Sequence, residues 1–161
     1  MNNEIFEQFA NHYTSSDFKK IKYEWNGKYG DEFFDQNYQF RMHLAEFLIP
    51  HLSTANLDLI RDIYLEMGKS SEATFGVYVN FNRFAQELLQ RGGVNYLMAY
   101  IEGASHTMDT ALSSGKISLS KERATELLNF FDERRQLTSD PNELTLLDDY
   151  FRSRFEYHAS K

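Results

Sequence analysis

The chain of 161 residues contains no cysteine and only two prolines. Without cysteine it has no disulfide framework, no thiol nucleophile and no cysteine-based metal site. This absence agrees with a cytoplasmic protein, which is the location that we expect. Because prolines are so few, little in the sequence interrupts long helices.

Long apolar runs and concentrated positive charge are also missing. The most apolar stretch, residues 44–52, contains Glu46, Pro50 and His51 and is too short to span a bilayer. The first residues lack a basic segment and an apolar core, so we expect no signal peptide and no membrane partner. Seventeen Lys and Arg against 24 Asp and Glu give a net charge of −7. That balance argues against nucleic acid as a ligand, because phosphate binding needs clustered Lys and Arg.

No motif for catalysis or cofactor binding is present. The sequence lacks the GxGxxG and GxxxxGK[ST] phosphate-binding patterns and the Gly-x-Ser-x-Gly nucleophile turn. We therefore predict a protein that is not an enzyme and that needs no cofactor.

Aromatic residues, by contrast, are abundant: 14 Phe, 10 Tyr and 1 Trp. Aromatic side chains fill cores and also anchor protein interfaces. A chain of this length forms one domain, residues 1–161, and buries roughly 70% of its unfolded surface. Acidic residues on the surface of such a domain would favour a basic protein partner.

Apolar periodicity predicts an all-α bundle of about seven helices joined by short connections. The first five are expected over residues 3–13, 31–49, 54–67, 72–92 and 94–113, the sixth after Ser118 or Ser120, and the seventh from Asp140. Asn2 or Asn3 is expected to cap the first helix, and Gly68 to end the third. The fourth helix includes Phe75, although the alternation from Phe75 to Phe81 would also suit a strand.

The start of the seventh helix has the clearest signal. Asp140 is expected at the N-cap, Pro141 at the first helical position and Glu143 three residues after the cap. The apolar residues that follow step by three and four along one face; they are Leu144, Leu147, Phe151 and Phe155. In the same way, the fifth helix is expected to bury Met108 and Leu112.

Residues 14–30 leave three structures open. Ile21, Tyr23 and Trp25 alternate with charged residues, and Asn26-Gly27 suits a type I′ turn, which favours a short hairpin near residues 20–30. An isolated hairpin is only marginally stable, so a packed loop or a short helix fits as well. Trp25 is then either an exposed binding residue or a partly buried one.

Two histidine patterns are candidate sites. Glu102, His106 and Asp109 lie at i, i+4 and i+7 on one face of the expected fifth helix, an arrangement that could ligate a metal or transfer protons. The better interpretation is a solvated face with a weak Glu–His pair, so we expect no metal. His43 and Glu46 form a His-x-x-Glu pair among apolar neighbours, which predicts a buried, hydrogen-bonded histidine.

The distribution of charge gives the candidate binding surface. Between Gly92 and Gly115 there is no Lys or Arg, while acidic residues remain. On the last helix, three carboxylates and two tyrosines lie off the apolar stripe. The predicted partner-binding residues are Asp148, Asp149, Tyr150, Glu156, Tyr157, Glu102 and Asp109. Carboxylates with rigid aromatics suit a basic protein surface; the alternative is ordinary solvated faces with the tyrosines packed on a neighbouring helix.

In size, charge and helical character the chain resembles the immunity proteins of bacterial contact-dependent inhibition and related toxin systems. The resemblance covers the whole chain and no motif carries it, so it assigns a role to no residue. It implies a protein that neutralises a basic partner such as a nuclease toxin domain; a phage inhibitor of bacterial defence would look similar. The alternatives are a metal-binding or enzymatic bundle built on Glu102, His106 and Asp109, and a regulatory helical domain that dimerises through its aromatic residues.

Overall fold

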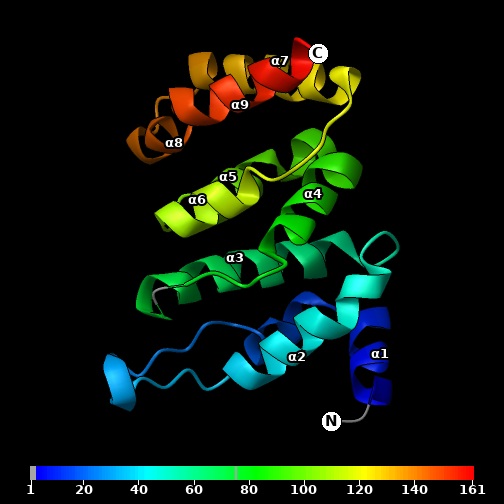
Figure 1. Ribbon diagram of the computed structural model, residues 1–161, viewed down its shortest axis with the longest axis vertical. Helices are drawn as coiled ribbons and strands as arrows, with labels where there is room; N and C mark the ends of the chain where they lie inside the picture. Colours follow the sequence, from blue (N-terminus) through cyan, green and yellow to red (C-terminus); the bar gives the residue numbers. More distant parts are fainter. Residues whose placement is uncertain (1–2, 75) are drawn as a thin grey trace.

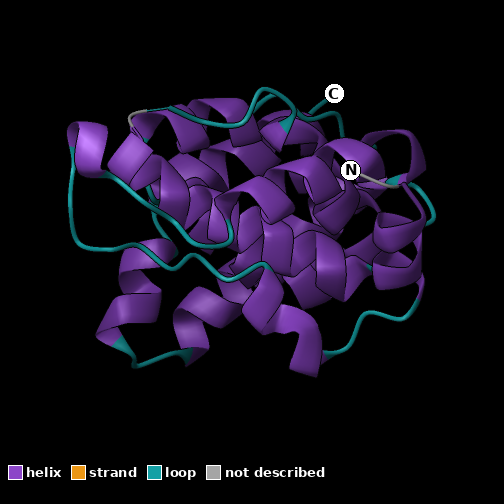
Figure 2. Cartoon of the chain, turned by 90° about the horizontal axis from the view of Figure 1, so that it is seen from below, coloured by secondary structure: helices purple, strands orange, loops and turns teal. Residues whose placement is uncertain are grey.

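A computed structural model of the chain describes residues 3–74 and 76–161, and within them the fold is all-α, as predicted. Figure 2 shows helices joined by loops, with no strand in this part of the chain. The α-helices are α1 (Asn3–Asn11), α2 (Tyr38–Leu48), α3 (Leu57–Thr74), α4 (Phe81–Gly92), α5 (Leu97–Ala104), α6 (Met108–Ser114), α7 (Lys121–Leu137), α8 (Pro141–Leu146) and α9 (Asp149–Ala159). In the described part of the chain four 3₁₀-helices lie between them: η1 (Ser15–Lys20), η2 (Gly30–Glu32), η3 (Ile49–His51) and η4 (Gly93–Tyr96).

The helices are stacked in the order in which they occur along the chain (Figure 1). Helices α1 and α2 form one end, α3 crosses next to them, α4 to α6 follow, and α7 to α9 form the other end. The long helix α3 packs against both α4 and α5, and α7 packs along α9. The N-terminal segment and the C-terminal helices therefore lie at opposite ends of the molecule, with α3 and α5 between them.

Much of the aromatic content is structural. The fully buried large side chains include Tyr64, Phe81, Tyr100, Phe131 and Phe155. The rings of Tyr64 and Phe81 stack with centroids 4.3 Å apart, which joins α3 to α4. Burying one such side chain stabilises the fold by about 1.5–3 kcal/mol. Most of the aromatic residues in the described part of the chain therefore contribute to the core, and only a minority are exposed.

The third helix does not end at Gly68, as the sequence predicted, but continues to Thr74. Gly68 lies where α3 crosses the end of α5: a Cβ added there would come within 2.7 Å of His106 Cδ2 and 2.8 Å of the Gly103 carbonyl oxygen. Its role is to allow close approach of two helices. Consequently the fourth helix begins at Phe81 and not near residue 72, and Gly76 lies in the loop before it. The predicted helical position Phe75 lies outside the described residues.

The second helix begins at Tyr38, so the prediction of a start near residue 31 was wrong. Residues 22–37 form a loop whose two sides meet at a single antiparallel bridge between Trp25 and Asp35. The buried Asp35 carboxylate accepts hydrogen bonds from the backbone N–H groups of Glu24 and Asn37, each at 3.1 Å. The hydrogen bonds to Asp35 replace the expected helix start, and Phe34, which lies in the range expected to be helical, is 60% exposed.

The fifth and seventh predicted helices are each divided in two. Thr107 caps α6 by accepting a hydrogen bond from the Thr110 N–H at 3.1 Å, and Asp148 caps α9 by accepting one from Phe151 N–H at 3.1 Å. On the seventh predicted helix three of the four stripe residues, Leu147, Phe151 and Phe155, are buried across the break, whereas Leu144 is 41% exposed. Met108 and Leu112, expected to be buried, are 78% and 57% exposed.

Two further predicted helix starts agree with the structure, whereas the third helix begins at Leu57 and not at residue 54. The Asp140 cap is confirmed, since its carboxylate accepts the Asn142 N–H at 2.9 Å, and Ser120 caps α7. The first helix ends at Asn11, before residue 13, and Asn3 is its first residue, while Asn2 lies outside the described residues. Within residues 3–74 and 76–161, no helix combines the length and the apolar character needed to cross a membrane.

Candidate protein-binding groove

A groove of about 600 Å³ separates α6 from the corner between α8 and α9. Its apolar walls are Met108, Ala111 and Leu112 on one side and Leu146, Tyr150 and Phe151 on the other. We call this feature the α6 groove. Tyr150 is 47% exposed, so three large apolar or aromatic side chains (Met108, Leu112 and Tyr150) stand open to solvent in one place. Exposed apolar surface of this kind marks interaction sites in folded proteins.

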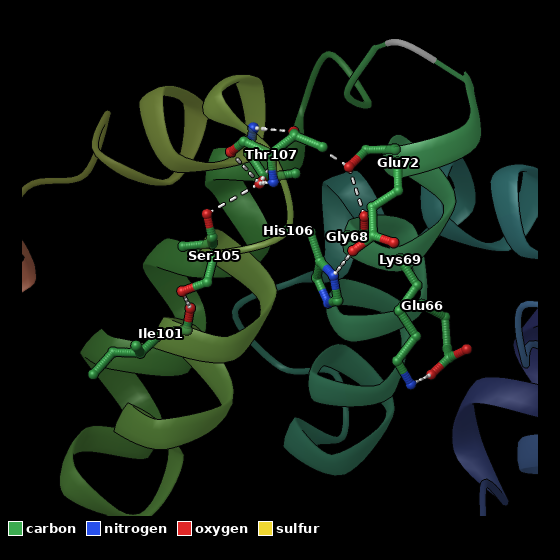
Figure 3. A network of polar contacts seen from close by, with 11 residues as sticks. Glu66, Gly68, Lys69, Glu72, Ile101, Ser105, His106 and Thr107 are labelled. Atoms are coloured by element: carbon green, nitrogen blue, oxygen red, sulfur yellow. Dashed lines mark hydrogen bonds and ion pairs between the residues drawn. The ribbon is translucent and has the colours of Figure 1, made fainter. Parts of the chain in front are cut away.

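The hydroxyl groups in the α6 groove already have partners. Ser105 Oγ donates to the Ile101 carbonyl at 2.7 Å, as Figure 3 shows, and Thr145 Oγ1 donates to the Pro141 carbonyl at 2.9 Å. Thr107 is occupied by its capping role. The Asp148 carboxylate also lines the groove. Its Oδ1 accepts the Phe151 N–H, and its Oδ2 remains able to accept a hydrogen bond from a bound molecule.

The structure places the seven predicted binding residues in three different surroundings. Asp148 and Tyr150 line the α6 groove, and the exposed Asp109 follows Met108 in the first turn of α6. Within the described residues neither Asp109 nor Asp148 forms an ion pair with Lys or Arg. Glu102 is exposed on α5, whose last residue, Ala104, lines the groove, but Glu102 itself is not part of the lining.

The remaining predicted residues of α9 are already engaged inside the protein. Asp149 pairs with Arg135 of α7 at 2.5 Å, and this hydrogen-bonded guanidinium lowers the pKa of the Asp149 carboxyl. Glu156 pairs with Arg152 at 3.2 Å. Tyr157 is exposed, with the Lys161 ammonium 4.0 Å from its ring centroid. One side of α9 is thus neutralised by arginines, whereas the acidic residues by the α6 groove are not.

The α6 groove is tied to the core by Arg154. Its guanidinium donates to the Tyr150 hydroxyl at 2.7 Å and to the Ala111 carbonyl at 3.0 Å, and it also donates to the Tyr100 hydroxyl. The Tyr100 hydroxyl in turn donates to the Ser114 carbonyl at 3.1 Å, and burial raises the pKa of Tyr100 to about 12. Both walls are therefore held by one hydrogen-bond network that reaches the buried Tyr100, which favours a preformed groove.

The predicted face of Glu102, His106 and Asp109 does not exist, because α5 ends at Ala104 and α6 begins at Met108. His106 lies in the connection and turns toward α3, where its Nδ1 is 2.6 Å from Glu72 Oε1 (Figure 3). A Glu–His pair is present, but with a partner from another helix. Among the described residues, no three His, Asp or Glu side chains gather in a way that could hold a metal ion.

Two further predictions concern isolated residues. His43 is exposed, so the expectation of a buried histidine was wrong. Trp25 is partly buried, which was the second of the two alternatives: its Nε1 donates to the Lys28 carbonyl at 2.6 Å and its ring packs edge-on against Tyr29 at 4.8 Å.

Sequence reasoning missed a cleft of about 790 Å³ between α1, η3 and the start of α3. The Arg91 side chain in its wall donates to the carbonyls of Leu52 at 2.6 Å and Ala55 at 2.7 Å. The cleft is larger than the α6 groove. Glu7 and His51 lie in the same wall as Arg91, so the lining does not carry charge of one sign that would select a charged partner. Sequence reasoning also missed Met108 and Leu112 as exposed anchors; the Thr107 cap was the signal that could have revealed them.

The chain matches no protein-family model, and no curated protein and no solved structure is significantly similar to it. The fold and the groove therefore define the protein by class alone, as an acidic all-α protein with an open apolar groove.

Proposed function

We propose that the protein is a non-enzymatic binding protein that neutralises a basic protein partner, in the manner of an immunity protein acting on a bacterial toxin in the cytoplasm. The observation that carries the proposal is the α6 groove: exposed apolar anchors lie beside Asp109 and Asp148, which pair with no Lys or Arg of the described chain. Other carboxylates of α9 do have such partners.

Physical chemistry explains why this arrangement favours a basic partner. When a partner covers the groove, water leaves Asp109 and Asp148, and an unpaired carboxylate in such a place is costly. A Lys or Arg from the partner offsets that cost and makes a charge-assisted hydrogen bond. The net charge of −7 also accelerates encounter with a cationic surface. A nuclease toxin domain fits this description, because binding nucleic-acid phosphates requires concentrated Lys and Arg.

The two alternatives have weaker support. A metal or proton-transfer site at Glu102, His106 and Asp109 would need residues that the end of α5 separates. A dimer through the α6 groove would bring Asp109 and Asp148 of one copy close to those of another, and like charges across an interface oppose association.

The proposal is tested by affinity capture from the native organism with the wild-type chain, Leu112→Lys and Leu137→Lys as baits. Leu112 and Leu137 are both exposed leucines near the C-terminal end of a helix, so the second variant is a matched control outside the groove. We expect a cationic protein that binds wild type and Leu137→Lys and is lost with Leu112→Lys. Expressed alone, that protein should arrest growth, and co-expression of the wild-type chain should restore it. An acidic partner, or one retained by Leu112→Lys, would contradict the proposal.

A further inference from the structure

The walls of the α6 groove restrict the kind of structure that can enter it. The walls are helices, and the backbone N–H and C=O groups of a helix are hydrogen-bonded to each other within that helix. The hydroxyls of Ser105, Thr107 and Thr145 are occupied, as described above. No strand edge exists within the described residues to pair with an extended segment.

An extended peptide would therefore bring its backbone N–H and C=O groups against apolar walls without partners. Each buried group left in that state opposes binding, because it has lost its hydrogen bonds to water and gained none in return. A helix satisfies its own backbone and can present apolar side chains to Met108, Leu112 and Tyr150. We infer that the part of the partner that enters the α6 groove is a short amphipathic α-helix whose apolar stripe is flanked by Lys or Arg.

The length of α6 sets the size of this helix. Seven residues rise by about 10 Å, or two turns. An occupant that follows this wall needs apolar residues at i, i+3 or i+4, and i+7. Basic residues beside that stripe would meet Asp109 at the start of α6 and Asp148 at the opposite wall. The inference rests on the proposed function, since it describes how the basic partner occupies the same groove.

The test uses a displayed library of random peptides long enough for about four helical turns, selected on the full-length protein with Leu112→Lys as the counter-selection target. We expect enriched peptides to show the i, i+3 or i+4, i+7 apolar spacing with Lys or Arg beside it. A proline placed at the centre of an enriched peptide should weaken its binding about 100-fold, because it breaks the helix. Binding to Leu137→Lys should equal binding to wild type, and circular dichroism should show that both variants are folded.

The outcomes separate this inference from the proposed function. Enriched peptides with alternating apolar residues, peptides that tolerate the central proline, or no peptide dependent on Leu112 would overturn the helix. If the cationic protein captured from the organism is nevertheless lost with Leu112→Lys, the proposed function stands and only the helix is wrong. A concentration-dependent dimer that dissociates in Leu112→Lys would replace the helix with a second copy of the chain.

Discussion

Buried and exposed carboxylates play different roles in the two ends of this molecule. On α3, the buried Asp62 accepts the Tyr13 hydroxyl at 2.6 Å and the buried Glu66 accepts the Tyr23 N–H at 2.7 Å, so that α3 holds the N-terminal segment. Beside the α6 groove, the exposed Asp109 and Asp148 have no cationic partner in the described chain. The acidic residues therefore include some that complete the fold and, in the proposed function, some that a partner would neutralise.

This difference separates stability from binding. Removing a partner from a buried carboxylate leaves an uncompensated charge and destabilises the folded state. Changing an exposed carboxylate moves stability little, but it alters the attraction for a cationic surface. We expect substitutions at the N-terminal end to change unfolding and substitutions at the α6 groove to change association.

The largest effect is expected from Arg41→Ala. Arg41 and Asp35 are both buried, their ion pair is 2.5 Å long, and Arg41 Nη1 also donates to the Ile21 carbonyl at 3.1 Å. The variant leaves Asp35 charged and unpaired, so the free energy of unfolding should fall by about 3–5 kcal/mol in urea titrations. Replacing Asp35 with Asn in the same variant should recover part of this loss. A change below about 1 kcal/mol would show that the buried pair does not hold this end of the fold.

The next largest effect is a loss of stability at alkaline pH. Burial raises the pKa of Tyr100 from 10.0 to about 12, so the unfolded chain releases this proton first. This contribution to the free energy of unfolding is fully present below pH 10 and is lost as the pH rises to 12. The loss from Tyr100 is about 3 kcal/mol. Burial also raises the pKa of Tyr64, which acts in the same direction. Unfolding titrations between these pH values should show the decline, and Tyr100→Phe should make it shallower; an equal slope in the variant would contradict the assignment.

A smaller effect is expected from Tyr13→Phe, which removes one hydrogen bond to the buried Asp62. Asp62 keeps its ion pair with Arg61, at 2.7 Å. The free energy of unfolding should therefore fall by about 1–3 kcal/mol. Tyr157→Phe, in which the exposed ring remains, is the matched control and should unfold like wild type. Equal loss in both variants would remove the distinction between the two ends of the molecule.

The smallest stability effect is expected at the α8 cap. Asp140→Ala removes the acceptor of the Asn142 N–H and should cost about 1 kcal/mol. Asp140→Asn keeps an acceptor and should cost much less. If thermal unfolding is the same for all three proteins, the cap contributes nothing measurable to the C-terminal end.

The features that could be predicted from the sequence are local ones. The helical class follows from apolar spacing, and the starts at Ser120 and Asp140 follow from side chains that bond within the next three residues. Gly68 was assigned wrongly because its reason is the close crossing of α3 and α5, which no neighbour in sequence reveals. Thr107 and Asp148 are capping residues, but apolar stripes that appeared to continue across them hid the two helix breaks.

The candidate site was predicted only in part for the same reason. Asp148 and Tyr150 were correctly placed on the surface, yet the groove needs α6 and α9, which meet only in the folded chain. Whether a carboxylate is neutralised also depends on such contacts. Asp149 pairs with Arg135 of α7, whereas Asp148, the residue before it, pairs with no Lys or Arg among the described residues.

The most direct test compares two double variants of equal charge change in binding to the captured cationic partner. Asp109→Asn with Asp148→Asn removes the carboxylate that lines the α6 groove and the one that follows Met108, and it keeps a capping side chain for α9. Asp149→Asn with Glu156→Gln removes acidic residues that already pair with arginines. At low ionic strength the groove variant should associate about tenfold more slowly, with a weaker dependence on salt, and the control should change by less than about twofold. Equal association rates for the two variants, or a larger loss in the control, would contradict the account.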